Sequence, residues 1–223
     1  MVREHLKCQA AEAAVAYVEP GMVLGVGAGS TTEQFVRVLA ASDRRPRAAV
    51  AASERSRALL ESLGISVVGL TGEIVPLALY VDGADEVDPR LRLIKGGGGA
   101  LTREKVIATA SRRFVCIVDE SKLVPTLGTF PLPLEVVPFA VHLVEHELRS
   151  RGSVPLLRAG YETDNGNRIL DVTGLDLSDP EQVERDLVGI PGVVECGIFA
   201  RRRADVVVIG TEAGPRRLEP QRV

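Results

Sequence analysis

Cysteine is scarce in this sequence, because only Cys8, Cys116 and Cys196 occur among its 223 residues. These three lie far apart, are odd in number and do not have the spacing of zinc-binding cysteines. We therefore expect neither a disulfide framework nor a structural zinc site, which is consistent with a reducing cytosol.

Long apolar runs and an excess of positive charge are also missing. No segment is apolar for long enough to span a bilayer, and residues 1–18 are charged and amphipathic, unlike a secretory signal. The net charge is −3, and the arginine-rich pieces SDRRPR and ARRRAD are short. We therefore expect a cytoplasmic protein that binds neither nucleic acid nor membrane.

Helix-like and strand-like segments alternate through the first 122 residues. The expected helices cover 4–18, 30–40, 54–64 and 103–111, and the expected strands cover 21–27, 47–53, 65–70, 76–86 and 113–122. This alternation predicts an α/β fold with a mostly parallel sheet, covered by helices on both faces. Such sheets bind ligands beyond the carboxyl ends of their strands. Three polar motifs of the sequence fall at those ends.

A second, smaller α+β domain is expected after a proline-rich stretch near Phe130. The segments there are strand 134–137, helix 140–150, strand 154–158, strand 168–172, helix 180–188 and strand 193–199. The order βαββαβ is that of a ferredoxin-like unit. The apolar run ADVVVIG that follows would return to the first sheet. The expected domains are thus 1–129 plus 203–223, and 130–202.

The first polar motif, GVGAGSTTEQF, follows a strand and opens a helix. Glycines there allow backbone N–H groups to approach an anion, and the helix N-terminus adds partial positive charge. The motif is neither a dinucleotide fingerprint nor a Walker loop, because Ser30 stands where a third glycine would be needed and no lysine precedes the hydroxyl residues. A phosphate site and a plain tight turn both remain open.

The second motif, VDGADEVD, places four carboxylates within seven residues at a strand end: Asp82, Asp85, Glu86 and Asp88. Like charges this close raise one another's pKa, as acid–base chemistry requires. They could equally bind a metal or form a solvated turn. Taken alone, this motif favours the turn.

The third motif, KGGGGALTREK, joins Lys95 to Glu104 through four consecutive glycines. Backbone amides in such a loop can stabilise a developing oxyanion beside a fixed cation. Glu104 could also be an ordinary first-turn acid of a helix. A helix start does not need four glycines, which are costly to order, so we favour a functional loop.

The pattern HLVEH, residues 142–146, matches a zinc motif, but it is short and falls in the smaller domain. We interpret it as two histidines on an ordinary amphipathic helix. Lys122, at the end of an expected strand, is predicted to face the same crevice as Lys95. Lys7 lies on the first expected helix, where a solvated lysine is the default.

Together these motifs resemble the type A ribose-5-phosphate isomerase family. The resemblance rests on GVGAGST, YVDGADEVD, LIKGGGGALTREK, VDESK, PLPLEVVPFA, TDNGNRILD and IPGVVECGIFARRRADVVVIGTEAG, which follow the family's order from Leu6 to Gly214. It implies a Rossmann-like domain with a smaller α/β domain, a homo-oligomer (a dimer or a dimer of dimers), and no metal or other cofactor.

The resemblance also implies site residues for the interconversion of D-ribose 5-phosphate and D-ribulose 5-phosphate. Glu104 would be the general base, Asp82 and Asp85 would contact hydroxyls or assist ring opening, and Lys95 would steady the enediolate. The remaining substrate contacts would be Lys7, Ala28, Gly29, Ser30, Thr31, Gly83, Ala84, Gly96, Gly97, Gly98 and Lys122.

One position departs from the family pattern, since Ala28 stands where the family usually has threonine. A backbone N–H survives this change, but a hydroxyl is lost. Two alternatives to the isomerase are a non-catalytic sugar-phosphate sensor and, resting on HLVEH, a metal-dependent isomerase. Retention of Glu104 together with Lys95 favours the enzyme, because fold alone does not decide function.

Overall fold

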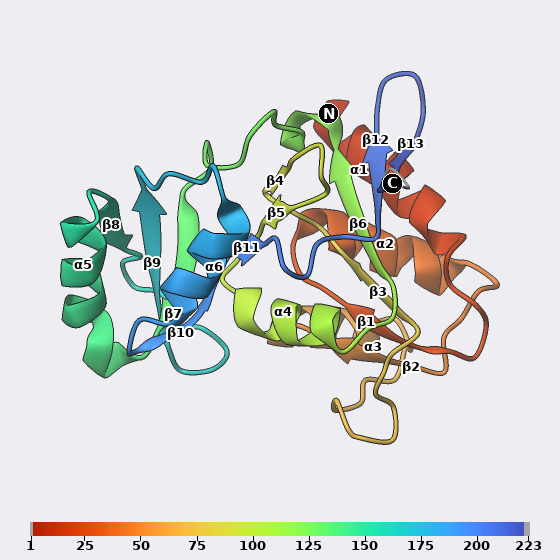
Figure 1. The fold of residues 1–223 in the computed structure, drawn as a ribbon. Helices are drawn as coiled ribbons and strands as arrows, with labels where there is room; N and C mark the ends of the chain where they lie inside the picture. Colours follow the sequence, from red (N-terminus) through yellow and green to blue (C-terminus); the bar gives the residue numbers. More distant parts are fainter. Residues whose placement is uncertain (1, 221–223) are drawn as a thin grey trace. The chain divides into compact units, whose positions relative to one another are not determined.

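The protein divides into two compact units in a computed structural model that describes residues 2–220 (Figure 1). Unit 1 contains the chain up to Ala84, residues Arg103–Lys122, and the chain from Ala204 onward. Unit 2 contains Asp85–Thr102 and Leu123–Arg203. Within the described residues, none of the helices is both long enough and apolar enough to cross a membrane.

Unit 1 is built on a six-stranded sheet in the order β13-β12-β6-β3-β1-β2. The strands are β1 (Val23–Val26), β2 (Ala48–Ala51), β3 (Leu79–Asp82), β6 (Phe114–Asp119), β12 (Val206–Gly210) and β13 (Arg216–Leu218). All neighbours pair in parallel except β12 and β13, which are antiparallel. The apolar run ADVVVIG therefore does return to the first sheet, as β12.

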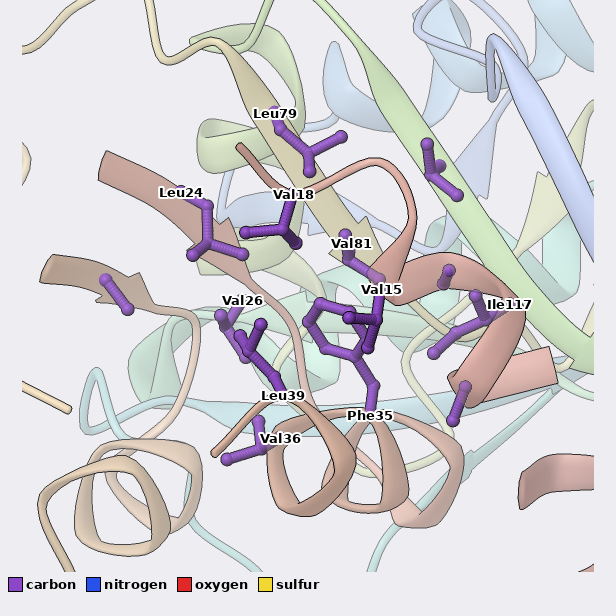
Figure 2. Packing of buried hydrophobic residues seen from close by; sticks show 14 of the residues in the cluster. Val15, Val18, Leu24, Val26, Phe35, Val36, Leu39, Leu79, Val81 and Ile117 are labelled. Atoms are coloured by element: carbon purple, nitrogen blue, oxygen red, sulfur yellow. The ribbon is translucent and has the colours of Figure 1, made fainter. Parts of the chain in front are cut away.

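The helices of unit 1 are α1 (Val2–Val15), α2 (Ser30–Ala41), α3 (Glu54–Ser62) and α4 (Leu101–Thr109), whose first two residues belong to unit 2, and η1 (Glu120–Lys122) is a short 3-10 turn. Phe35, Val36 and Leu39 recur at helical spacing and are completely or almost completely buried. Figure 2 shows them packed in one cluster with Leu24 and Val26 of β1. The apolar face of α2 thus explains why this segment is a helix on the sheet.

The two faces of the unit 1 sheet have different roles. Leu79 and Val81 of β3 point into the cluster beneath α1 and α2. Side chains alternate along a strand, so Tyr80 and Asp82 point to the opposite face. That face carries α4: a Cβ on Gly25 of β1 would lie only 2.4 Å from Ile107 of α4. The close approach of α4 therefore requires a glycine in β1.

The order of the strands creates a switch point at β1, which has β2 on one side and β3 on the other. The connections leaving β1 and β2 run in opposite directions across the sheet. Open α/β sheets bind ligands outside the carboxyl ends of the strands at such a point. The first two polar motifs lie there, the first running through Gly27 after β1 and the second through Asp82 on β3.

Unit 2 contains an antiparallel sheet in the order β10-β7-β9-β8. Its elements are β7 (Leu132–Val136), η2 (Pro138–Ala140), α5 (Val141–Ser150), β8 (Val154–Leu157), β9 (Arg168–Thr173), α6 (Pro180–Val188) and β10 (Val193–Cys196). This confirms the βαββαβ order. Leu134, Leu170, Val144 and Leu187 are buried in the core between this sheet and its two helices.

A three-stranded sheet, β11-β5-β4, completes unit 2. Its strands are β4 (Glu86–Val87), β5 (Leu93–Ile94) and β11 (Ile198–Phe199). Because β4 pairs with β5 and β5 pairs with β11, residues 85–102 group with unit 2, and so do residues 123–129. This division of the chain differs from the expected boundary at 129–130.

One expected strand is wrong. Residues 65–70 make only an isolated parallel bridge, between Val67 and Ala49. The Ala49 N–H donates to the Ser66 carbonyl and the Val68 N–H donates to the Ala49 carbonyl, with no further ladder. Val68 is 37% exposed, so the apolar run is not buried as a central strand would be. The expected strand 76–86 is likewise shorter, because regular pairing covers only Leu79–Asp82 before the acidic turn.

Candidate active site

The turn after β1 leads directly into helix α2, as the first motif predicted. Gly29 is the N-cap residue with φ of 93°, a conformation that favours glycine, and as a glycine it offers the helix no side-chain cap. The first N–H groups of α2 are thus available to an anion. The structure also brings Lys7 here: its Nζ donates to Ser30 Oγ at 3.0 Å and to the Glu4 carboxylate at 2.7 Å.

Asp82 is completely buried at the end of β3, below this turn. Its Oδ1 accepts hydrogen bonds from the Ala28 N–H at 3.0 Å, the Gly83 N–H at 2.7 Å and the Thr32 hydroxyl at 3.1 Å. Gly27 leaves room for the carboxylate, since a Cβ on this residue would lie 1.8 Å from the Asp82 Cγ. Asp82 therefore fixes the turn, and it engages the Ala28 N–H.

Tyr80 donates a hydrogen bond to Asp82 Oδ2 from a completely buried position. Burial raises the pKa of the Tyr80 hydroxyl well above its usual value, and the negative charges of Asp82 and Glu104 raise it further. Sequence reasoning missed this residue. The available signal was its spacing, because residues two apart on a strand share a face.

Glu104 lies in the first turn of α4 and is 4% exposed. The guanidinium of its neighbour Arg103 pairs with Glu54 at 2.8 Å. A carboxylate in the first turn of a helix lies close to the partial positive charge of the helix N-terminus. A buried carboxylate whose charge acts on Tyr80 beside Asp82 is a candidate proton-transfer group. Glu104 and Asp82 are thus two buried carboxylates of unit 1 whose charges both raise the pKa of the Tyr80 hydroxyl.

The acidic turn and the glycine loop meet within unit 2. Asp85 Oδ2 accepts the Gly97 N–H at 2.8 Å, and a Cβ on Gly97 would lie 2.8 Å from Asp85 Oδ1. Gly96 has φ of 103°, which again favours glycine. Lys95 is 2% exposed, with its Nζ 5.5 Å from the centre of the Phe199 ring. The loop thus offers a buried cation and closely packed backbone amides.

The other two carboxylates of the acidic motif support the backbone. Glu86 accepts the N–H groups of Gly128 and Phe130. Asp88 accepts the N–H of Arg92 at 2.9 Å and pairs with its guanidinium at 2.6 Å. Asp82 and Asp85 are therefore the members of the motif that remain candidates for chemistry.

The HLVEH segment forms part of α5. The side chain of His142 is 96% exposed, and its Nδ1 lies 3.3 Å from a Glu145 carboxylate oxygen. Among residues 2–220, the structure does not group three His, Cys, Asp or Glu side chains as a metal site would require. The arrangement is that of histidines on an amphipathic helix.

The remaining predicted contacts are Gly83, Ala84, Gly98 and Lys122. Gly83 and Ala84 are half-buried between the two aspartates, and Gly98 is the exposed glycine of the third motif. Lys122 ends η1 and is half-buried. The residues of the predicted site are thus divided between the units: Asp85 and residues 95–98 belong to unit 2, and the others belong to unit 1.

Known proteins resemble this chain over nearly its whole length. A family model described as ribose 5-phosphate isomerase A (phosphoriboisomerase A) matches residues 48–214. Ribose-5-phosphate isomerase A of Acidithiobacillus ferrooxidans is 54% identical over 96% of this chain and 97% of its own. The protein of that name from Bordetella bronchiseptica is 51% identical, over 98% of each chain.

Solved structures give the same result. Ribose 5-phosphate isomerase A from Neisseria gonorrhoeae has a TM-score of 0.96 at 47% identity, covering 99% of this chain and 98% of its own. A D-ribose-5-phosphate isomerase in complex with phospho-erythronic acid has a TM-score of 0.92 at 39% identity, over 98% of this chain and 100% of its own. With this agreement in sequence and fold, the chain belongs to the ribose 5-phosphate isomerase A family.

Proposed function

We infer that the protein is an aldose–ketose isomerase that interconverts D-ribose 5-phosphate and D-ribulose 5-phosphate, in the non-oxidative branch of the pentose phosphate pathway. The observation that carries this inference is 54% identity to a curated isomerase over 96% of the chain. It is supported by the buried carboxylate of Glu104 in the first turn of α4, a group of the kind that the reaction requires.

The reaction moves a proton between adjacent carbons of the open-chain sugar. We propose that Glu104 takes the proton from C2, the electron pair forms the C1=C2 bond, and negative charge develops on O1. A proton then moves from O2 to O1, and Glu104 returns its proton to C1, leaving a carbonyl at C2. A carboxylate base within reach of both carbons suffices for this sequence.

The negative charge on O1 calls for donors that are already in place. In this proposal Lys95 and the amides of Gly96 and Gly98 stabilise the enediolate. The Gly97 amide, which the sequence also assigned to this role, contributes through the shape of the loop. Asp85 holds the Gly97 N–H at 2.8 Å and so keeps the loop in shape. Asp82 and Asp85 contact sugar hydroxyls or assist ring opening. For Asp82 this role falls to Oδ2, which also accepts the Tyr80 hydroxyl, since Oδ1 accepts three hydrogen bonds from the protein.

The phosphate needs an anchor remote from the reacting carbons, so that its binding energy positions them. The uncapped start of α2, with Gly29, Ser30 and Thr31, is the proposed anchor, and Lys7 adds positive charge beside Ser30. The Ala28 N–H already donates to Asp82. Its contribution to phosphate binding is therefore indirect, through the shape of the turn. Lys122 is proposed as a further contact.

The test of this function is direct. Purified protein is mixed with ribose 5-phosphate, and formation of ribulose 5-phosphate is followed with and without EDTA. We expect turnover that EDTA does not reduce, because the described residues form no cluster of metal ligands. Absence of turnover would instead favour the sugar-phosphate sensor. Loss of turnover with EDTA would favour the metal-dependent alternative.

We propose a homo-oligomer in the cytoplasm as the working form. Apolar side chains are exposed on unit 2, with Phe139 of η2 fully exposed and Leu156 of β8 70% exposed. Strand β8 is also an edge of its sheet, and unpaired edges favour association with another chain. The three free cysteines, two of them buried, support a reducing compartment.

A further inference from the structure

The peptide groups of the glycine loop are held by hydrogen bonds from within unit 2. The Gly97 N–H donates to Asp85 at 2.8 Å, and the Gly99 N–H donates to the Gly96 carbonyl at 2.8 Å. The hydroxyl of Tyr161 donates to the Gly98 carbonyl at 2.8 Å. Two of the three peptide planes from Gly96 to Gly99 therefore have their N–H groups already engaged.

Arg158 holds the remaining plane. Its Nη1 donates to the Gly97 carbonyl at 3.1 Å. The same guanidinium forms a two-pronged ion pair with Asp171 of β9, from Nε at 2.9 Å and from Nη2 at 2.6 Å. The two bonds to Asp171 fix the orientation of the planar guanidinium, so that Nη1 faces the loop. The Arg158 side chain is 21% exposed, so solvent competes only in part for these bonds.

The consequence for the loop follows from peptide geometry. In a trans peptide the C=O and the following N–H point in opposite directions. Holding the Gly97 carbonyl against Arg158 therefore turns the Gly98 N–H to the other side. Within the part of the chain that the structure describes, this N–H donates to no protein group. Gly98 is exposed, and a Cβ there would meet nothing within 4 Å.

We propose that Arg158 is a positioning residue, which orients the Gly97–Gly98 peptide so that the Gly98 N–H donates to the oxyanion of the enediolate. The inference rests on the proposed isomerase reaction and adds to it a group that does not touch the substrate. Asp171 shares this role by fixing the guanidinium. A lost or misdirected donor weakens binding of the charged intermediate more than binding of the ground-state sugar.

The experiment compares Arg158→Met with Arg168→Met. Arg168 lies on β9 and pairs with the 61% exposed Glu162, so its replacement removes an arginine from the same unit without touching the loop. For Arg158→Met we expect kcat to fall by about tenfold to a hundredfold, with KM within about threefold of the unmodified protein. Arg168→Met is expected to keep kcat within about twofold.

A binding measurement separates positioning from general damage. The probes are 4-phospho-erythronic acid, whose carboxylate carries negative charge near the position of the enediolate oxygens, and inorganic phosphate. Arg158→Met is expected to weaken binding of 4-phospho-erythronic acid by about tenfold and to leave binding of inorganic phosphate within about twofold. Equal weakening of both probes, or no weakening of either, would overturn the proposal.

Two further variants guard against loss of folding. Asp171→Asn keeps the side-chain shape but frees the guanidinium, and Arg158→Lys keeps the charge but loses the fork. Both are expected to lower kcat at an unchanged melting temperature. If Arg158→Met does not fold, Arg158→Lys becomes the test of the proposal. Turnover of Arg158→Lys within about twofold of the unmodified protein would then refute it. Failure of the isomerase function itself would show differently, as absence of turnover in the unmodified protein.

Discussion

At the scale of single residues, the site depends on carboxylates that the fold removes from water. Glu104 is buried, and Asp82 is completely buried yet accepts hydrogen bonds from two backbone N–H groups and from the hydroxyls of Thr32 and Tyr80. These donors replace the water that the buried carboxylate has lost. The contacts of Asp82 with the turn are thus shown by the structure, and its contact with substrate is a proposal.

Replacing Glu104 by glutamine tests the proposed base. The amide is similar in size but cannot accept a proton from C2, so kcat should fall by at least about a hundredfold while the substrate still binds. Single-turnover kinetics and equilibrium binding of ribose 5-phosphate measure the two effects separately. Near-normal turnover would contradict the role assigned to Glu104.

Replacing Tyr80 by phenylalanine tests the buried phenol. Without its hydroxyl one hydrogen bond to Asp82 is lost, so the free energy of unfolding near pH 7 should fall by about 1–2 kcal/mol. The folded state raises the pKa of Tyr80 above its usual 10.0. The associated stability is thus fully present below pH 10.0 and is lost as the pH rises toward the folded-state pKa.

The phenylalanine variant has no phenol to ionise at this position. The difference in unfolding free energy between the two proteins should therefore narrow above about pH 10. Urea unfolding of both proteins at a series of pH values measures this difference in free energy. A difference that stays constant through the alkaline range would argue against the neutral, buried hydroxyl.

At the scale of elements, glycines decide how closely the segments of the site approach one another. Gly25 lets α4 lie against β1, and Gly27 makes room for the carboxylate of Asp82 beneath the turn before α2. Both contacts join segments that are far apart in the sequence. The glycine-rich motifs therefore do more than provide flexible backbone, since they permit close packing at the switch point of the sheet.

Replacing Gly27 by alanine should disrupt this turn. The new Cβ would lie 1.8 Å from the Asp82 Cγ, so either β1 or the carboxylate must move. We expect a loss of about 1–3 kcal/mol in the free energy of unfolding and a fall of at least about tenfold in kcat.

Gly69→Ala is the matched control, because a Cβ there meets nothing within 4 Å. Thermal melts and steady-state kinetics of the two variants provide the comparison. Equal melting temperatures and equal kcat values for the two variants would show that the turn tolerates a side chain at Gly27.

At the scale of the whole molecule, the exposed apolar side chains of unit 2 predict self-association. Light scattering coupled to size exclusion should give a mass that is a multiple of the 23.8 kDa chain. Phe139→Asp should shift the population toward the single chain, because burying an unpaired carboxylate in an interface is unfavourable. Val68→Asp, at a 37% exposed position in unit 1, should leave the mass unchanged. A single-chain mass for the unmodified protein would refute the oligomer.

The sequence by itself determined the order of most elements, the split into a parallel and an antiparallel sheet, and the two strand ends that carry Asp82 and the turn before α2. These follow from local spacing of apolar residues and from glycine-rich turns, which are short-range patterns. The strand predicted at residues 65–70 was wrong, because an apolar run does not show whether its backbone pairs with a neighbouring strand.

Only the tertiary structure decided which groups meet. The Ala28 N–H reaches Asp82 across 54 positions of the chain, and Arg158 reaches Gly97 across 61. The hydrogen bond from Tyr80 to Asp82 also depends on the tertiary structure. So do the contacts by which Glu86 and Asp88 support the backbone, because strand pairing and helix packing create them. Spacing in the sequence places a residue on a face of its own element. The partner across that face is set by which elements pack together, and a short pattern carries no information about that.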